Sequence, residues 1–311
     1  MITKNIQSQE TLRKMTGDAF PEKEIERITE LTEGMCNVAY RILFSDGSES
    51  ILKIAAKDRS GNTSNEIGLM EAEVTAMQLV REYTHIPVAI VYKYDISHTL
   101  CSGDYFFMEK MPGENLSKIK DALSVEERTG IYEQIGQYSR QLTAIGNASF
   151  GMLGDSKSFS SLYEFVRYLL DNLIRDAKNR SIDILFDGDE LLDSLAEDRR
   201  VFESVEHATL VHWDMWEGNI FVENGRVSGI IDWERAMWGE PFMDDRFRHH
   251  NRNQAFLAGF GQTVFSEDEK KRLRWYDIIL YLTMMIEVFY REFEDDGQYR
   301  WAAEMLKEVY G

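Results

Sequence analysis

Short apolar runs separated by turn residues predict β-hairpins in two parts of the chain. Tyr40-Arg-Ile-Leu-Phe44 and Ser50-Ile-Leu-Lys-Ile54 flank the turn Ser45-Asp-Gly-Ser48, and an Asp-Gly pair between such runs is typical of a hairpin. Two later apolar runs flank Glu223-Asn-Gly-Arg226 in the same way. A further strand is predicted from Asp104, ending in a Pro-Gly turn.

Apolar residues at helical spacing predict that the chain after Gly113 is mainly helical. Capping boxes open two of these helices, Ser124-Val-Glu-Glu127 and Ser266-Glu-Asp-Glu269. The predicted helices span residues 65–81, 124–145, 161–178, 188–204, 266–291 and 297–309. The pattern therefore indicates an α+β chain with an N lobe over residues 1–112 and a C lobe over residues 113–311.

Two carboxylates and an amide surround the second hairpin at a spacing typical of phosphoryl transfer. Asp214 and Asn219 stand five residues apart, as in the kinase pattern H-x-D-x-x-x-x-N, where the Asp accepts the proton of the substrate hydroxyl and the Asn binds magnesium. Asp232 follows the second strand of the hairpin, so it and Asn219 are predicted to share one Mg²⁺ ion, which prefers oxygen ligands. His212 is predicted to brace the backbone of this loop.

A lysine that contacts the phosphates is predicted in the first hairpin. Lys53 lies inside its second strand, although a lysine in a strand could also point to solvent. The following helix places Glu73 on its apolar stripe, where a carboxylate needs a cation. Lys53 and Glu73 are therefore predicted to form the pair that positions the α- and β-phosphates. The rival carboxylate, Glu71, is expected to face solvent.

These motifs resemble the catalytic core of the aminoglycoside phosphotransferase family, which comprises small-molecule kinases. The family usually has H-G-D-x-x-x-x-N, then I-D-[WF], then G-[DE]-P-x-x-D, and this chain has His212-Trp-Asp214, Ile231-Asp-Trp233 and Gly239-Glu-Pro-Phe-Met-Asp244 in that order. The resemblance implies a bilobal protein-kinase-like fold, in which Asp244 buttresses the catalytic loop. Trp213 departs from the pattern, because a small residue is usual there.

The resemblance also implies where the nucleotide binds. The chain has neither a G-x-G-x-x-G nor a G-x-x-x-x-G-K-[ST] motif, which argues against a Rossmann site and a P-loop. The family instead carries a G-x-x-N or G-x-S-N turn, and Gly34 with Asn37 fit it. The segment from Met108 to Met111 corresponds to the linker whose backbone binds the adenine or guanine base. ATP or GTP is the expected donor, with Mg²⁺ as cofactor.

The acidic charge of the chain indicates which kind of molecule would accept the phosphoryl group. The 54 acidic and 35 basic side chains give a net charge of −19, and residues after Pro112 hold 37 of the acidic and 23 of the basic ones. Such a field repels nucleic acid and anionic membranes and attracts cations. Candidate contacts to an acceptor are acidic or aromatic residues of the second part of the chain: Glu217, Glu234, Trp238 and Glu287.

The sequence thus favours a kinase that moves the γ-phosphoryl group of ATP or GTP to a hydroxyl of a small polar, cationic molecule such as an aminoglycoside, with antibiotic resistance as the implied role. A macrolide, choline, homoserine or a sugar is the alternative acceptor. A catalytically silent nucleotide-binding regulator is a further alternative. A protein kinase is disfavoured, because only six residues separate Asp232 from Gly239.

The chain is expected in the cytoplasm and without membrane contact. Its first residues lack the apolar stretch of a secretory signal, and its two cysteines, Cys36 and Cys101, make no disulfide framework. The apolar run Ile278–Met285 is far shorter than the roughly 20 residues of a membrane span. It is predicted to be part of a buried helix.

Overall fold

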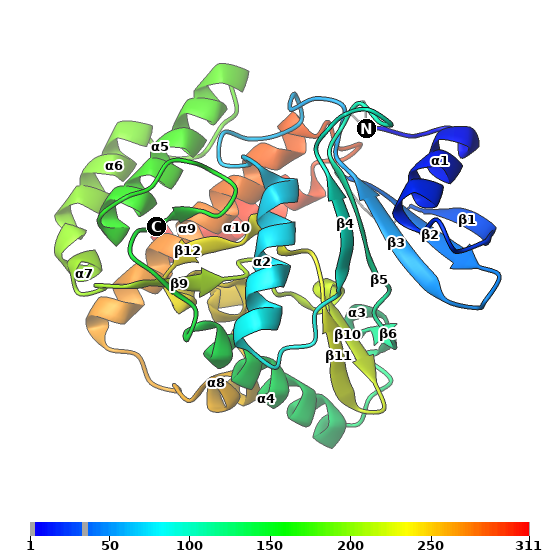
Figure 1. The fold of residues 1–311 in the computed structure, drawn as a ribbon. Helices are drawn as coiled ribbons and strands as arrows, with labels where there is room; N and C mark the ends of the chain where they lie inside the picture. Colours follow the sequence, from blue (N-terminus) through cyan, green and yellow to red (C-terminus); the bar gives the residue numbers. More distant parts are fainter. Residues whose placement is uncertain (1–3, 33–36, 311) are drawn as a thin grey trace.

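The computed structural model describes residues 4–32 and 37–310. An antiparallel sheet of five strands occupies the N-terminal part, in the order β1-β2-β3-β5-β4, and the helices of the C-terminal part gather on one side of it (Figure 1). These strands are β1 (Ile25–Leu31), β2 (Val38–Phe44), β3 (Glu49–Ile54), β4 (Val91–Asp95) and β5 (Tyr105–Glu109). The α+β class that the sequence predicted is therefore present.

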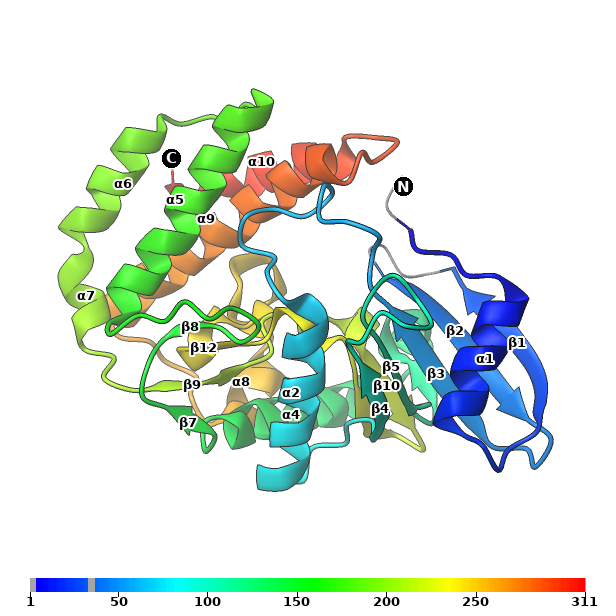
Figure 2. The same ribbon diagram turned by 45° about the horizontal axis from the view of Figure 1, so that its top comes forward.

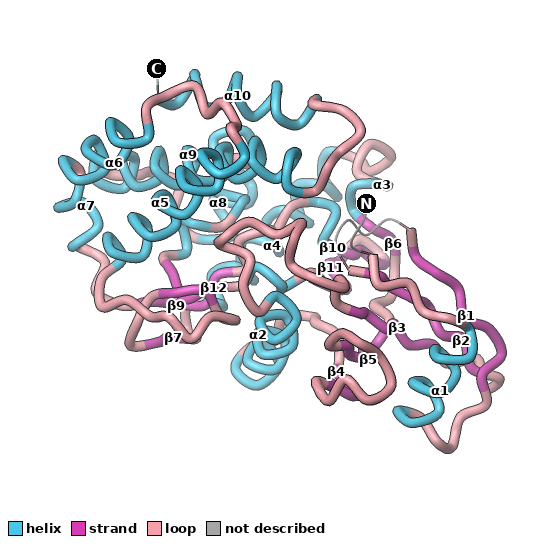
Figure 3. Tube along the Cα trace, turned by 90° about the horizontal axis from the view of Figure 1, so that it is seen from above, coloured by secondary structure: helices cyan, strands magenta, loops and turns pink. Residues whose placement is uncertain are grey.

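Helices provide most of the remaining structure. They are α1 (Gln9–Ala19), α2 (Leu69–Tyr83), α3 (Leu116–Ile119), α4 (Val125–Leu142), α5 (Leu162–Arg180), α6 (Gly188–Glu197), α7 (Arg199–Glu203), α8 (Gln254–Phe260), α9 (Glu267–Tyr290) and α10 (Gly297–Tyr310). Both predicted capping boxes are formed, at Ser124 and at Ser266. Seen from above, α2 stands between the five-stranded sheet and the group α5, α6, α9 and α10 (Figure 3).

Two short sheets lie among these helices and frame the predicted catalytic motifs. One has the order β11-β10-β6, with β6 (Glu114–Asn115), β10 (Ile220–Glu223) and β11 (Arg226–Ile230). The other has the order β7-β9-β12-β8, with β7 (Gly146–Asn147), β8 (Gly151–Met152), β9 (Ala208–Val211) and β12 (Met237–Gly239). The β10–β11 hairpin turns at Asn224 and Gly225, whose φ angles of 51° and 72° explain the Asn-Gly pair.

Some predicted helix limits were wrong. The helix expected from Asn65 begins only at Leu69, because residues 63–68 are held by contacts to α5 and Gly68 has φ 57°. The helix expected over residues 188–204 is divided at Asp198 into α6 and α7. Helices α1 and α8 were not predicted. In α1 only Leu12, Met15 and Thr16 are buried, a stripe too short to stand out in the sequence.

The core consists of two apolar clusters on opposite faces of the five-stranded sheet. On one face, Leu12 and Met15 of α1 pack with strand residues such as Ile42 and Phe107. On the other face, Phe106 joins α2 and the apolar residues of the C-terminal helices in one continuous cluster. Within the described residues, no helix combines the length and apolar character of a membrane span, and Ile278–Met285 lies inside α9. The division at Pro112 remains a prediction.

The packing of α4 against α8 gives a test of this core. A Cβ atom added at Gly136 would lie 2.1 Å from the carbonyl oxygen of Phe256, whereas one added at Gly130 of the same helix meets nothing within 4 Å. Gly136→Ala should lower the free energy of unfolding by about 1–3 kcal/mol, because the helices must separate. Gly130→Ala should raise it by about 0.5–1 kcal/mol through helix propensity. Urea unfolding of both variants checks this, and equal effects would contradict the packing.

Candidate active site

The β10–β11 hairpin brings the two ends of the predicted catalytic region together. Strand β9 ends at Val211, and the loop that follows passes through the 3₁₀ turn η1 (Glu217–Asn219) into β10. At the other end of the hairpin, the backbone N–H of Ile231 donates to the carbonyl oxygen of Asn219 at 3.0 Å. Asp232 is the next residue along the chain, so the structure places it beside the loop that carries Asp214 and Asn219.

Asn219 is bonded directly to Asp214. Its Nδ2 donates to the carbonyl oxygen of Asp214 at 2.9 Å and to Asp214 Oδ2 at 3.2 Å. This leaves Asn219 Oδ1 available as an oxygen ligand. Burial raises the pKa of the Asp214 carboxyl well above its usual range, and the nearby guanidinium of Arg235 only partly opposes this. A carboxylate in this environment binds a proton readily once a hydroxyl delivers one.

His212 braces the loop, as the sequence predicted. It is fully buried, and its Nε2 lies 2.9 Å from the carbonyl oxygen of Ile231, while its Nδ1 accepts from the backbone N–H of Asp214 at 3.2 Å. These two contacts set the tautomer, with the proton on Nε2. Burial lowers the pKa of His212 to about 4, so the ring is neutral at physiological pH. Its role in the structure is to hold the loop.

Lys53 lies between two carboxylates from different parts of the chain. Its Nζ is 2.6 Å from Glu73 Oε1 on α2 and 2.7 Å from Asp232 Oδ1. Burial disfavours the ammonium, but Asp232 and Glu73 outweigh burial and raise the pKa of Lys53, so it stays charged. Glu71 is exposed, as predicted. The Lys53–Glu73 pair is therefore confirmed as a contact, and Asp232 joins it.

A third carboxylate, Glu234, completes an acidic group around Lys53. One carboxylate oxygen from each of Glu73, Asp232 and Glu234 lies within 4.8 Å of the others. Glu73 Oε2 is buried and has no hydrogen-bond partner among the described residues. Burial, with Asp232 nearby, raises the pKa of Glu234 to about 8. An all-oxygen group of this kind suits a hard cation such as Mg²⁺.

Asn37, the described residue of the predicted phosphate turn, contacts this acidic group. Asn37 Nδ2 donates to Glu234 Oε2 at 2.8 Å, across 197 positions of the sequence. Gly34, the other residue predicted for this turn, lies outside the described residues. The predicted base-binding segment begins on β5 with the buried Met108, whose carbonyl oxygen accepts from Ser50 Oγ at 2.8 Å, and continues to the buried Met111. Base binding by this segment remains a prediction.

The residues predicted to contact an acceptor have different surroundings. Glu217 accepts from Arg246 Nη1 at 3.0 Å and from the hydroxyl of Tyr132 at 2.7 Å, so these groups hold its carboxylate inward. Glu287 is buried and pairs with Arg235. These three contacts were not predicted from the sequence, which placed both carboxylates at the acceptor. The other two candidates are Glu234, which lies on the lysine side of the site, and Trp238, which is half-buried in β12.

Further residues behind the loop hold it in place. Asp244 Oδ2 accepts from the backbone N–H of Trp213 at 3.1 Å, so the buttress that the family resemblance implied is present. The sequence reasoning missed Arg246, which is fully buried and donates from Nε to the carbonyl oxygen of Met215 at 2.6 Å. Its contacts to this loop could not be recognised from a local pattern, because Glu217 and Met215 lie 29 and 31 residues earlier in the chain.

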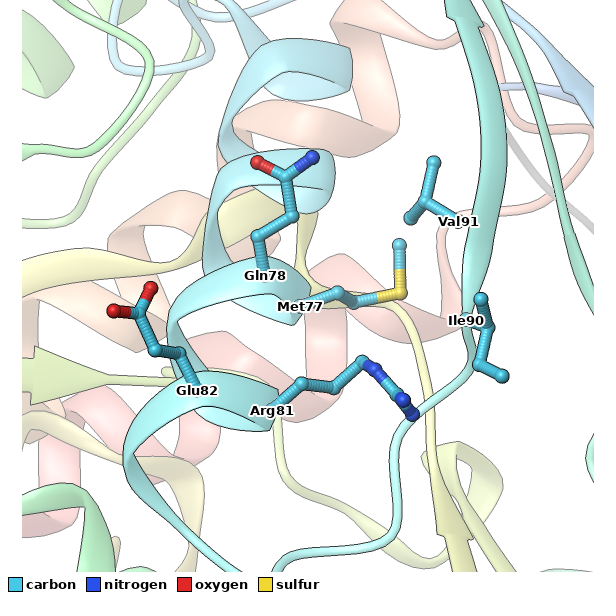
Figure 4. Close-up of a pocket in the computed structure, with 6 residues that line it drawn as sticks. All are labelled: Met77, Gln78, Arg81, Glu82, Ile90 and Val91. Carbon is cyan, nitrogen blue, oxygen red and sulfur yellow. The ribbon is translucent and has the colours of Figure 1, made fainter.

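A surface hollow lies away from all these residues. It is bounded by α2 and β4 and lined by Met77, Gln78, Arg81, Glu82, Ile90 and Val91 (Figure 4). The sulfur of Met77 and the side chains of Ile90 and Val91 face one another across it. None of the candidate catalytic or metal-binding residues lines this hollow, so it is not part of the candidate active site.

Solved structures with the same fold are similar to this chain over nearly its whole length. A Haemophilus somnus 129PT protein provisionally named fructosamine-3-kinase has a TM-score of 0.70 at 14% identity, with 97% of each chain covered. Aminoglycoside phosphotransferase APH(4)-Ia has a TM-score of 0.65 at 17% identity, covering 97% of this chain and 98% of its own. APH(2″)-IIa, in a ternary complex with streptomycin and ATP, has a TM-score of 0.63 at 14% identity, with 97% of each chain covered. These likenesses confirm the bilobal protein-kinase-like fold.

Comparisons at the level of sequence identify the family. No curated protein sequence matches this chain significantly. The profile of the phosphotransferase enzyme family, APH, matches residues 27–245, a range that contains the Lys53–Glu73 pair, the catalytic loop and Asp232. This match extends over more than half of the chain and agrees with the motifs and with the fold. The chain belongs to the APH phosphotransferase family.

Proposed function

We propose that this phosphotransferase is a magnesium-dependent small-molecule kinase that moves the γ-phosphoryl group of ATP or GTP to a hydroxyl of a polar, cationic acceptor such as an aminoglycoside. The observation that carries the proposal is the position of Lys53 between Glu73 and Asp232, with Asn219 bonded to Asp214 in the adjoining loop. One small region thus holds a cation for phosphates, oxygen ligands for a metal and a carboxylate base.

On the nucleotide side, Lys53 is the group that contacts the α- and β-phosphates. Glu73 is fully buried and fixes the direction of the lysine side chain, which is itself 11% exposed. An ammonium held in one position by a buried carboxylate interacts with phosphate oxygens at little further cost in side-chain entropy. Asn37, the described residue of the phosphate turn, lies close to the same group through Glu234.

The metal ligands of the proposal are Asn219 and Asp232. Asn219 uses its amide N–H in the bond to Asp214, which leaves its oxygen free, and Asp232 is partly exposed at 35%. Two protein oxygens, with phosphate oxygens and water for the remaining positions, are what Mg²⁺ usually takes. When bound, the ion neutralises the charge that develops on the phosphates. The carboxyl groups of Glu73 and Glu234 lie beside this position, and a bound cation would favour their ionised forms.

Asp214 is the base of the proposal. Its carboxylate orients the acceptor hydroxyl and takes the proton as the oxygen attacks the γ-phosphorus atom, while the bond from that phosphorus to the β–γ bridging oxygen breaks and ADP or GDP leaves. Asn219 and the backbone contact to His212 hold Asp214 in place during this step. Burial of the carboxylate favours the transfer, because it raises the affinity of Asp214 for the proton.

The charge of the chain supports a cationic acceptor. The carboxylates of Asp245, Asp232 and Glu287 all contribute to the negative field at Asp214. Several solved relatives of the fold carry aminoglycosides, namely hygromycin B on APH(4)-Ia and streptomycin on APH(2″)-IIa. A screen for acceptor-dependent formation of ADP or GDP, with hygromycin B, streptomycin, erythromycin and choline, each with ATP and with GTP, tests the acceptor class.

Two substitutions should separate the base from the metal site. Asp214→Asn should keep Mg-nucleotide affinity and lower kcat by roughly 10²–10⁴, the usual contribution of a positioned proton acceptor. Asp232→Ala should weaken Mg-nucleotide binding itself, because it removes an oxygen ligand. Steady-state kinetics and calorimetry with Mg-ATP and Mg-GTP measure both effects. Full activity of Asp214→Asn would overturn the assignment of Asp214 as the base. Unchanged nucleotide affinity of Asp232→Ala would show that Asp232 is not a metal ligand.

Salt dependence should distinguish a polycationic acceptor from a neutral one. The attraction between the acidic C-terminal part and a polyamine fades as the Debye length falls from about 10 Å at 0.1 M salt to about 3 Å at 1 M. We expect kcat/KM for an aminoglycoside to fall steeply over that range, while the nucleotide KM changes less because close contacts determine it. A flat profile for the best acceptor would favour a macrolide or a cellular metabolite.

A further inference from the structure

Trp213, the residue before the proposed base, has an unusual backbone conformation. Its φ angle is 75°, in the left-handed region that bulky L-residues rarely adopt. The loop needs this conformation, because the N–H of Trp213 donates to Asp244 Oδ2 and its carbonyl oxygen accepts from the N–H of Asp245 at 3.0 Å. A small residue would take this conformation more easily. Something must therefore hold the tryptophan in place.

The guanidinium of Arg235 provides that support. It lies over the indole ring of Trp213, with 5.0 Å between its central carbon and the ring centroid. Arg235 belongs to the 3₁₀ turn η2 (Trp233–Arg235), directly after the proposed metal ligand Asp232. A planar guanidinium stacked on an indole is a favourable contact, more so where both are shielded from water, and the Arg235 side chain is only 13% exposed.

Arg235 is itself held by carboxylates from two other segments. Its Nη2 contacts Glu66 Oε1 at 2.9 Å and also pairs with Glu287 of α9. Arg291, the residue directly after α9, contacts both of these carboxylates. We call these four side chains the ion cluster: Glu66, Arg235, Glu287 and Arg291. It holds two positive and two negative charges, so the buried guanidinium groups are balanced.

Glu66 connects the ion cluster to the nucleotide side of the site. It lies in the segment between β3 and α2, which leaves the sheet and crosses to the ends of α5 and α9 (Figure 2). This segment is anchored on α5, where Ser64 donates from its N–H and from its Oγ to Asp176, each at 2.6 Å. The segment leads into α2, which carries Glu73, the partner of Lys53.

We propose that Arg235 is a positioning residue for Asp214: it supports the left-handed conformation of Trp213 and, through Glu66, ties the catalytic loop to the segment that orients the Lys53–Glu73 pair. One continuous series of side-chain contacts then positions both the proposed base and the proposed phosphate-binding lysine. This inference rests on the proposed function, because it assumes that Asp214 is the base. It also explains how this chain accommodates a tryptophan where its family usually has a small residue.

The test is a double-mutant cycle on Trp213 and Arg235. Arg235→Lys keeps the charge that Glu66 and Glu287 need but lacks the planar group that stacks on the indole. We expect kcat to fall roughly 10- to 100-fold, since small misplacements of a catalytic group have effects of this size. The affinity for Mg-ATP and Mg-GTP should be nearly unchanged. Glu66→Gln removes the charge that pairs with Arg235, so it should also lower kcat.

Glycine at position 213 should rescue the defect. Trp213→Gly adopts a φ of 75° without support, so the double variant Trp213→Gly with Arg235→Lys should be more active than Arg235→Lys alone. Arg274→Met is the matched control, because it removes a guanidinium stacked on Trp275 away from the site and should leave kcat unchanged. The rate is formation of ADP or GDP from Mg-ATP or Mg-GTP with the best acceptor of the screen, or with water where none is phosphorylated.

The outcomes distinguish this inference from the function on which it rests. An unchanged kcat for Arg235→Lys, or a double variant no more active than Arg235→Lys, overturns the positioning role while Asp214→Asn still loses activity. Full activity of Asp214→Asn overturns the proposed function itself. Urea unfolding of each variant is measured alongside. If Trp213→Gly restores kcat in the Arg235→Lys background without restoring the unfolding midpoint, the positioning role is supported. If kcat and the unfolding midpoint recover together, Arg235 has a role in stability alone.

Discussion

The buried ammonium group of Lys53 is the constraint around which the rest of the site is arranged. A lysine on an inner strand of a sheet must be paired, because an unpaired buried charge is strongly destabilising. Its partners come from two distant places, Glu73 on α2 and Asp232 after the β10–β11 hairpin. This charge therefore fixes α2 against the sheet and brings the hairpin to the same point. The proposed phosphate-binding cation, the proposed metal ligand and the position of α2 therefore follow from one requirement.

The loop that carries Asp214 follows the same logic for its backbone groups. The loop is short and irregular, so its backbone donors and acceptors cannot pair within a helix or a sheet. Side chains satisfy them instead: His212 accepts from Asp214, Asp244 accepts from Trp213, and Arg246 donates to Met215. Each of these side chains is buried. These contacts favour one geometry of the loop, which suits the role proposed for Asp214 toward an acceptor hydroxyl.

The ion cluster has a different character from the Lys53 contacts. It joins segments that do not belong to the sheet, namely the segment before α2, the turn η2 and the helix α9. Balanced charges of this kind add little stability compared with apolar residues of similar volume, but they specify which segments meet. In this protein the cluster lies directly against Trp213, whose backbone conformation is the least expected feature of the loop. The contacts that specify how these segments assemble therefore lie beside the proposed base.

The sequence by itself determined the local elements and the proposed chemistry of the loop. The Asp-Gly and Asn-Gly hairpins, the two capping boxes and the order of Asp214, Asn219 and Asp232 are short-range patterns, so they could be recognised directly. The burial of Glu73 was also predictable, because one stripe of a helix carries it. These features depend on residues a few positions apart, where backbone geometry leaves few choices.

Only the tertiary structure decided the contacts between distant segments. The start of α2 at Leu69 depends on contacts to another helix. Three further contacts join residues far apart in the sequence: Glu217 with Arg246, Glu287 with Arg235, and Asn37 with Glu234. A charged side chain has the same local pattern whether it meets solvent, a substrate or a buried partner. Its role depends on which other segments pack against it, and that is set by the three-dimensional arrangement of the whole core.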